Sequence, residues 1–293
     1  MASHGAAHPC GPAREPVLGA LRREIAAIEG TRVALEERRG LPFGIAAIDA
    51  VLGGGLAGGA VHEVGAAVGH RGAAFGFALA LAARAHQARR ADDVLWVETS
   101  FAATESGRLY GVGLESFGLP FARLLIVRVP HPRDVLWVTE EALGCRGIAA
   151  VIAVVARDPD LTATRRLSLA VRDSGGLGVL IRERSTPYAS AALTRWQVAA
   201  APSRPDAFGG IGRTAFDLTL TKNRHGPGGR WTILWDHHER AFLDPLSVGV
   251  ARTAGDRPDR ALERIGAFRS GAERSGAERH ALRRAGGALR RAG

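Results

Sequence analysis

Residues 41–81 read LPFGIAAIDAVLGGGLAGGAVHEVGAAVGHRGAAFGFALAL, and this stretch decides the fold. Within it, Val61–Val64 predicts a strand. A glycine-rich turn follows, and the small and apolar residues from about Ala73 to Arg89 predict a helix. A strand, a turn and a helix in this order indicate the start of an α/β domain.

The alternation of strand and helix continues to about residue 245. The run Ala149–Val155 contains no polar residue, as expected of a strand that is buried on both faces. We therefore expect an α/β fold with a mainly parallel central sheet flanked by helices. The other expected strands are 94–98, 124–129 and 178–181, the expected helices are 134–143 and 162–174, and a hairpin pairs 216–222 with 230–235.

Composition narrows the classes of protein to which the chain can belong. Its 293 residues, 46% of them hydrophobic, suffice for one α/β domain with short appendages. The longest nearly apolar stretches, Gly72–Ala85 and Gly147–Ala156, are too short to cross a bilayer, and no secretory signal is visible. Cys10 and Cys145 form no metal-ligand pattern and suit a reducing compartment. We expect a cytoplasmic protein without membrane association.

The net charge of +10 favours an anionic partner, either DNA or an acidic protein surface. A compositional preference for arginine is the alternative explanation, because Lys222 is the only lysine in the chain.

The two ends differ from the middle of the chain in composition and in hydrophobic pattern. Within the N-terminal segment 1–40, residues 14–39 have apolar side chains at helical spacing and predict an amphipathic helix. The segment 251–293 repeats SGAER and ALRRAG, is basic and has few large apolar residues, so we expect a disordered tail. This tail is either an inert solvated segment or a docking arm.

The residues before the first expected strand resemble RecA and its relatives. The segment FGIAAIDAVLGGGLAGGAVHEV, residues 43–64, has the spaced branched residues, the aspartate and the glycine-rich turn that precede the phosphate loop in that family. The resemblance implies a RecA-like core over residues 41–250. The matching positions are Ile45, Ile48, Asp49, Leu52, Gly53, Gly54, Gly55, Leu56, Gly59 and Glu63.

The phosphate loop itself is degenerate. A working loop has the pattern Gly-x4-Gly-Lys-Ser/Thr, in which amides cradle the phosphates, the lysine neutralises them and the hydroxyl holds magnesium. With Gly72 as the last motif glycine, Ala73 replaces the lysine and Ala74 the hydroxyl residue. Arg71 offers a charge, but a guanidinium does not reproduce an ammonium. We expect nucleotide binding to be weak or absent, and its residues would be Gly65, Gly69, Arg71 and Gly72.

The magnesium side of the site is also reduced. RecA relatives end a buried strand with an aspartate, whereas Val155 falls near that position and Asp158 lies beyond the strand end. Glu98 falls near the family's acidic cluster, as a relic or a residual base. Losing the lysine, the hydroxyl and the metal aspartate removes most of the electrostatic stabilisation of phosphoryl transfer. We therefore expect no ATP hydrolysis. We also expect no metal site at Asp236–His238, because adjacent strand residues point to opposite faces.

Two later segments narrow the resemblance to the ImuA family of inducible-mutagenesis accessory proteins. They are ASAALTRWQVAAAPS, residues 189–203, and DLTLTKNRHGPGGRWTILWD, residues 217–236. The resemblance implies a non-catalytic adaptor, without cofactor, that acts with ImuB and an error-prone polymerase in SOS-induced translesion synthesis and DNA repair. RecA or another RecA-fold subunit is a further implied partner. The alternatives are a surviving RecA-type ATPase and an arginine-rich module that binds single-stranded DNA.

The region from Arg182 to Arg213 is the candidate for contact with DNA or a partner. In RecA the corresponding loop helps to hold single-stranded DNA, and arginines interleaved with aromatics can contact phosphates and stack on bases. An ordered loop whose Trp196 packs into the core is the alternative. Lys222-Asn223-Arg224 resembles the Lys-Asn-Lys of RecA, which reaches a neighbouring subunit. The candidate contact residues are Arg182, Arg184, Arg195, Trp196, Arg213, Lys222 and Arg224.

Overall fold

The computed structural model describes residues 40–182, 188–203, 205 and 209–245. The expected amphipathic helix 14–39 and the expected tail 251–293 lie outside the described residues, as does Arg184.

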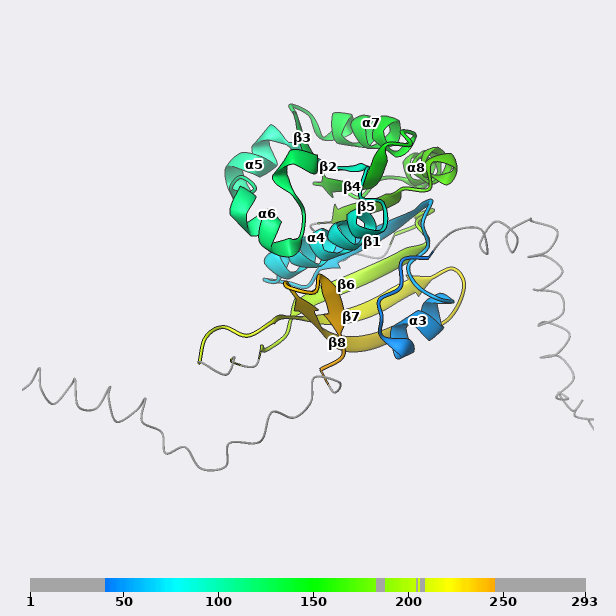
Figure 1. Cartoon of the computed structure of the whole chain (residues 1–293). Helices are drawn as coiled ribbons and strands as arrows, with labels where there is room; N and C mark the ends of the chain where they lie inside the picture. The colour runs from blue at the N-terminus through cyan, green and yellow to red at the C-terminus, as the bar shows by residue number, and fades with distance from the viewer. Residues whose placement is uncertain (1–39, 183–187, 204, 206–208, 246–293) are drawn as a thin grey trace, which may run out of the picture. The chain divides into compact units, whose positions relative to one another are not determined.

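The centre of the fold is a nine-stranded sheet in the order β3-β2-β4-β5-β1-β6-β7-β8-β9 (Figure 1). The pairs from β3 to β6 are all parallel, and β7, β8 and β9 are joined antiparallel, so the expected mainly parallel sheet is confirmed. The strands are β1 (Ala60–Ala66), β2 (Asp93–Thr99), β3 (Leu124–Val129), β4 (Ile148–Val155), β5 (Leu177–Arg182), β6 (Thr194–Ala200), β7 (Thr214–Asn223), β8 (Gly229–Asp236) and β9 (Ala241–Leu243).

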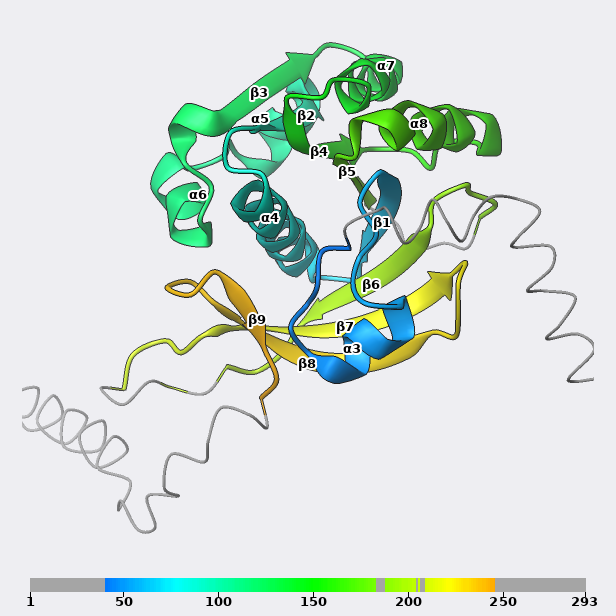
Figure 2. The ribbon, with the colours of Figure 1, turned by 45° about the vertical axis from the view of Figure 1, so that its right-hand side comes forward.

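Helices flank both faces of the parallel part, as expected. Figure 2 shows α4 on one face and α7 and α8 on the other, and a separate apolar core lies on each side. Most of α4 is alanine, leucine and phenylalanine, and it is buried along most of its length. The helices are α3 (Ala46–Leu52), α4 (Arg71–Ala88), α5 (Ser100–Ser106), α6 (Gly111–Phe117), α7 (Pro132–Leu143) and α8 (Leu161–Ser174), with a short 3₁₀ turn, η1 (Phe121–Arg123).

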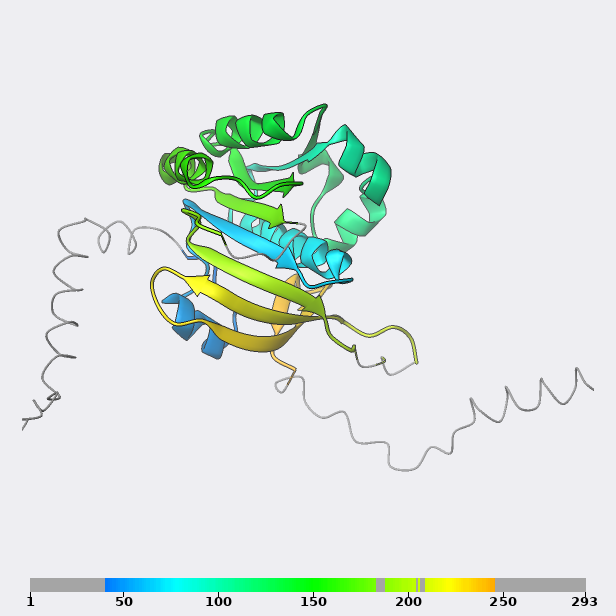
Figure 3. The same ribbon diagram turned by 180° about the vertical axis from the view of Figure 1, so that it is seen from behind.

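The antiparallel part is covered differently. Burial in β7 and β8 alternates along the strands, whereas β4 is buried almost throughout. Figure 3 shows the face of β6, β7 and β8 over which no described helix lies. The sequence patterns differ for the same reason, because a strand covered on one face needs apolar residues only at every second position.

The glycine-rich segment before β1 contains a helix that we did not predict. The helix α3 ends at Gly53, which has a left-handed backbone, and Gly55 packs so closely that a Cβ atom would lie 2.6 Å from the carbonyl oxygen of Leu41. The Asp49 carboxylate accepts hydrogen bonds from the amides of Phe43 and Gly44, at 2.7 and 2.9 Å. The RecA-like aspartate and glycines therefore have a structural role here, which is to fold this segment before β1.

The segment between β5 and β7 corrects a second expectation. We expected a long loop, but Thr194–Ala200 forms β6, which lies beside β1 in the middle of the sheet. Its residues alternate between buried and partly exposed positions, and this period is that of a strand with one covered face.

Candidate functional site

The connection from β1 to α4 stands where a phosphate loop is expected. Most of the predicted loop belongs to regular elements: Gly65 lies within β1, between β5 and β6, and Gly72 is the second residue of α4. Only Ala67–His70 form the turn, in which Gly69 has a φ of 78°. Of the three retained glycines, therefore, only Gly69 serves the turn itself.

Several amides of this connection are already bonded within the protein. The amide of Ala67 donates to the Val198 carbonyl at 2.9 Å, and that of His70 donates to the Ala67 carbonyl at 2.9 Å. The His70 side chain accepts a hydrogen bond from the amide of Ala200 at 3.1 Å, which fastens the turn to the end of β6. A phosphate cradle needs amides that point at the ligand, and the amides of Ala67 and His70 are instead directed at carbonyls of the protein.

The lysine and the nearest arginine do not occupy the positions that cationic side chains have in a phosphate site. The only lysine, Lys222, lies on β7, where its ammonium donates to the carbonyl of Ser190 at 2.6 Å. Burial lowers the pKa of Lys222. Arg71 lies at the start of α4 with its guanidinium 5.1 Å from the centre of the Phe75 ring. No lysine therefore reaches the β1–α4 connection.

Both carboxylates considered for magnesium or general-base roles face arginines. Glu98 is 4% exposed and accepts hydrogen bonds from Arg128 Nε at 2.9 Å and from Trp96 Nε1 at 3.0 Å. Asp158 accepts a hydrogen bond from Arg182 Nε at 2.7 Å. The described residues contain no group of three or more His, Cys, Asp or Glu side chains that could hold a metal ion.

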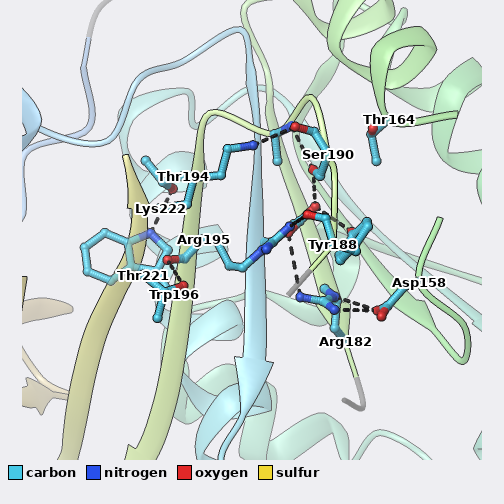
Figure 4. Close-up of polar contacts among 12 residues, drawn as sticks. Asp158, Thr164, Arg182, Tyr188, Ser190, Thr194, Arg195, Trp196, Thr221 and Lys222 are labelled. Carbon is cyan, nitrogen blue, oxygen red and sulfur yellow. Dashed lines mark hydrogen bonds and ion pairs between the residues drawn. The ribbon is translucent and has the colours of Figure 1, made fainter. Parts of the chain in front are cut away.

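A buried ionic cluster lies on the opposite face of the sheet from α4, beside α8. We call it the Glu63 cluster, and it consists of Glu63, Arg182, Tyr188, Ser190 and Arg195. The Glu63 carboxylate is 0% exposed and accepts hydrogen bonds from Tyr188 Oη at 2.6 Å, from Arg195 Nε at 2.6 Å and from Ser190 Oγ. Figure 4 shows these side chains converging from β5, β6 and the segment after residue 187.

Arginines enclose the aromatic ring of the Glu63 cluster. The guanidinium carbons of Arg182 and Arg195 lie 4.2 and 4.5 Å from the centre of the Tyr188 ring. Arg182 is 1% exposed and also pairs with Asp158, with Nη2 2.6 Å from the carboxylate. Burial and the hydrogen bond to Glu63 raise the pKa of Tyr188, so its hydroxyl stays protonated and donates. The cluster ties the segment containing Tyr188 and Ser190 to β1, β5 and β6.

The structure changes the interpretation of the candidate contact residues. Trp196 is 0% exposed and packs against Phe43 and Phe77, with ring centres 5.7 and 5.9 Å apart. Stacking of Trp196 on a base is therefore contradicted, because its ring belongs to the core. Arg182 is likewise unavailable to a phosphate at the surface. The sequence suggested contact residues here because it does not show that β6 turns Trp196 inward.

The other candidate contact residues lie apart from one another. Arg195 belongs to the Glu63 cluster, and Lys222 bonds the same segment through Ser190. Arg213 pairs with Asp236 at 2.6 Å and keeps 47% of its side chain exposed. Arg224 is exposed and donates to the Ala191 carbonyl at 3.5 Å. The structure thus brings Arg195, Lys222 and Arg224 near one segment, Tyr188–Ala191, and leaves Arg213 elsewhere.

A cavity of about 490 Å³ opens beside the start of α4, and we call it the α4–α6 cavity. Sequence reasoning missed it, because its outer wall is the segment Thr99–Phe117, for which we predicted no helix. Two signals could have revealed that wall: Thr99 caps the start of α5 by accepting from the Ala102 amide at 3.0 Å, and Gly118 ends α6 in a left-handed conformation. The wall residues include Arg71, Phe75, Glu98, Arg108, Tyr110, Leu114, Phe117 and Phe216.

The fold defines an α/β domain with a mainly parallel sheet, and the turn after β1 lacks the lysine and the hydroxyl residue of a phosphate loop. No family model matches the chain. Over 209 residues it is 36% identical to Protein ImuA of two Caulobacter vibrioides strains, NA1000 / CB15N and ATCC 19089 / CIP 103742 / CB 15. Each match covers 66% of this chain and 82% of the relative. The chain belongs to the ImuA family.

One negative finding concerns membranes. Among the described residues, no helix is both long enough and apolar enough to span a bilayer.

Proposed function

We propose that this protein is a non-catalytic accessory factor of SOS-induced mutagenesis. It acts in the cytoplasm as an adaptor with ImuB and an error-prone polymerase in translesion synthesis and DNA repair. Membership of the ImuA family supports the role in mutagenesis. RecA or another RecA-fold subunit is the second protein partner that we propose.

The absence of catalysis is supported above all by the pairing of the two candidate carboxylates. Glu98 is bonded by Arg128 and Trp96, and Asp158 by Arg182. A general base or a magnesium ligand needs lone pairs directed at its substrate or metal, whereas the Glu98 carboxylate faces Arg128 and Trp96, and Asp158 Oδ1 faces Arg182. Ala73 and Ala74 stand where the phosphate-loop pattern has a lysine and a serine or threonine, so neither a positive charge nor a hydroxyl is present there.

The proposal is tested by capture of purified ImuB and RecA from the same organism on immobilised full-length protein, beside an assay of ATP hydrolysis. We expect capture of ImuB and a hydrolysis rate equal to the background of the buffer. Absence of capture would contradict the adaptor role. Hydrolysis that disappears in the variant Glu98→Gln would contradict the non-catalytic role and favour a surviving ATPase.

Direct DNA binding is the alternative that the same samples can test. Binding of single-stranded DNA is measured by fluorescence anisotropy at several salt concentrations, because phosphate contacts make affinity fall steeply with salt. Strong binding to DNA without capture of ImuB would favour a DNA-binding module. The variant Arg213→Ala removes an exposed arginine of the candidate contact region, and Arg165→Ala is the matched change at an exposed arginine on α8.

A further inference from the structure

The α4–α6 cavity is lined mainly by apolar side chains. They come from three directions, which are α4, the α5–α6 segment and the start of β7. The apolar lining residues include Phe75, Leu79, Leu109, Leu114, Phe117 and Phe216. A lining of this kind favours an aromatic or branched aliphatic group, because burial of apolar surface is the main gain on binding.

The charged groups around this cavity are predominantly positive. Arg71 and Arg108 line it, and the one carboxylate in its wall, Glu98, is bonded by Arg128. The start of the 18-residue helix α4 adds its positive end to the same side. An apolar group that enters the cavity would therefore be favoured if it were flanked by carboxylates.

The surface next to the cavity carries exposed apolar side chains. Tyr110, which lines the cavity, is 72% exposed, and Val112 and Phe121 are 62% and 58% exposed. A Cβ atom at Gly111, between the first two, would lie 3.5 Å from the Phe121 ring, so Phe121 packs beside the backbone of this segment. An apolar pocket with an exposed apolar rim is typical of a protein-binding surface. A small ligand inside the cavity would leave the apolar side chains of the rim uncovered.

The neighbouring turn argues against a nucleotide triphosphate in this place. The amides of Ala67, His70 and Ala73 donate to backbone carbonyls of the protein, and His70 bonds to the end of β6. The phosphates of a nucleotide whose base filled the cavity would meet a turn in which these three amides are already bonded. A peptide carboxylate does not need such a cradle, because a single arginine can bind it.

We propose that the α4–α6 cavity binds an aromatic or branched aliphatic side chain of an acidic peptide segment in a partner protein. The inference rests on the proposed adaptor function and names the surface that such a partner would use. The apolar anchor fills the cavity between α4 and α6, and an acidic residue beside it pairs with the exposed Arg108.

The test is a selection of random peptides displayed on phage against the full-length protein. The variant Gly72→Trp places an indole at the cavity wall, where a Cβ atom meets no other atom within 4 Å. Its matched control is Gly147→Trp, since Gly147 has the same free space and lies outside the cavity wall. Arg108→Glu reverses a charge at the cavity, and Arg165→Glu, an exposed position on α8, is its control.

We expect the selected peptides to share an aromatic or aliphatic residue flanked by Asp or Glu. Affinity for them should fall at least about tenfold in Gly72→Trp and Arg108→Glu and stay unchanged in both controls. Thermal unfolding of each variant checks that it is folded. A selection without such a consensus, or binding that is equal in Gly72→Trp and Gly147→Trp, would overturn the inference. Displacement of the peptides by low concentrations of Mg-ATP would also overturn it.

The two proposals can fail separately. If the protein captures ImuB but the Gly72→Trp variant captures it equally well, the adaptor function stands and the cavity is not the surface used. If the wild-type protein captures no partner but still selects acidic peptides, the adaptor function fails and the peptide site stands.

Discussion

Two sites along the strand β1 differ in the charged groups that they contain. At its end, the β1–α4 connection has the position of a phosphate site, but the amides of Ala67 and His70 are bonded within the protein and no lysine lies there. In its middle, Glu63 is wholly buried and gathers two arginines, a tyrosine and a serine around one carboxylate. The contrast teaches that the buried ionic contacts around Glu63 join segments of the chain that are far apart in sequence.

Removing the centre of the Glu63 cluster should have the largest effect. The variant Glu63→Gln leaves two arginines facing a neutral group, with Arg182 almost fully buried. Breaking a buried ion pair in this way costs about 3–5 kcal/mol, so we expect a loss of that size in the free energy of unfolding. Urea denaturation measures it, with Asp217→Asn on the partly exposed face of β7 as the control. A loss below about 1 kcal/mol would show that the cluster does not stabilise the fold.

His62, on the other face of β1, should make the free energy of unfolding depend on pH. Burial lowers the pKa of His62 to about 4 from its ordinary 6.5, because the buried ring loses the water that would solvate its charged form, and the hydrogen bond to the Ala57 carbonyl offsets only part of this effect. The unfolded chain takes up this proton first, so the stabilisation is complete above about pH 6.5 and is lost as the pH falls towards 4. The full loss is about 3 kcal/mol. Urea denaturation from pH 7.5 to 4.5 should show a shallower decline in His62→Gln, and equal slopes would contradict the prediction.

A smaller change tests the hydrogen bonds of the Glu63 cluster separately from its charges. The variant Tyr188→Phe keeps the ring between Arg182 and Arg195 but removes the hydroxyl that donates to Glu63. We expect a loss of about 1–2 kcal/mol in the free energy of unfolding, since the acceptor is charged but the tyrosine is only half buried. Tyr110→Phe, at an exposed position outside the cluster, should change it by less than about 0.5 kcal/mol. Similar losses in the two variants would refute a specific role of the hydroxyl.

The smallest effect is expected at the β1–α4 connection. A ligand that binds only the folded state raises the unfolding temperature, so Mg-ATP at millimolar concentration should shift the Tm by less than about 1 °C. Differential scanning fluorimetry measures the shift, with Mg²⁺ alone as the control. A rise of several degrees that is lost in the variant Gly69→Val would show that the turn still binds nucleotide.

Particular residues show how far the sequence predicts this fold. The β4 run was recognisable because a strand covered on both faces is apolar throughout, and α4 because small and apolar residues continue for several turns. The short helices α3, α5 and α6 were missed, since each is only 7 residues long and too short to show a helical period. The strand β6 was missed because its arginine and tryptophan were interpreted as contacts with DNA or a partner.

The sequence alone determined which chemical groups are missing from the phosphate site, because no arrangement of the chain can supply a lysine that it does not encode there. It also predicted the strands β1 to β5 and the helices α4, α7 and α8 in their order along the chain, but not α5, α6 or β6. Only the tertiary structure decided where the remaining charges go. Glu63 and Arg195 are separated by 132 positions yet meet across neighbouring strands. A one-residue shift in β6 would turn Arg195 towards the core and Trp196 towards the opposite face of the sheet. Such pairings depend on sheet register, which is fixed by the packing of the whole core.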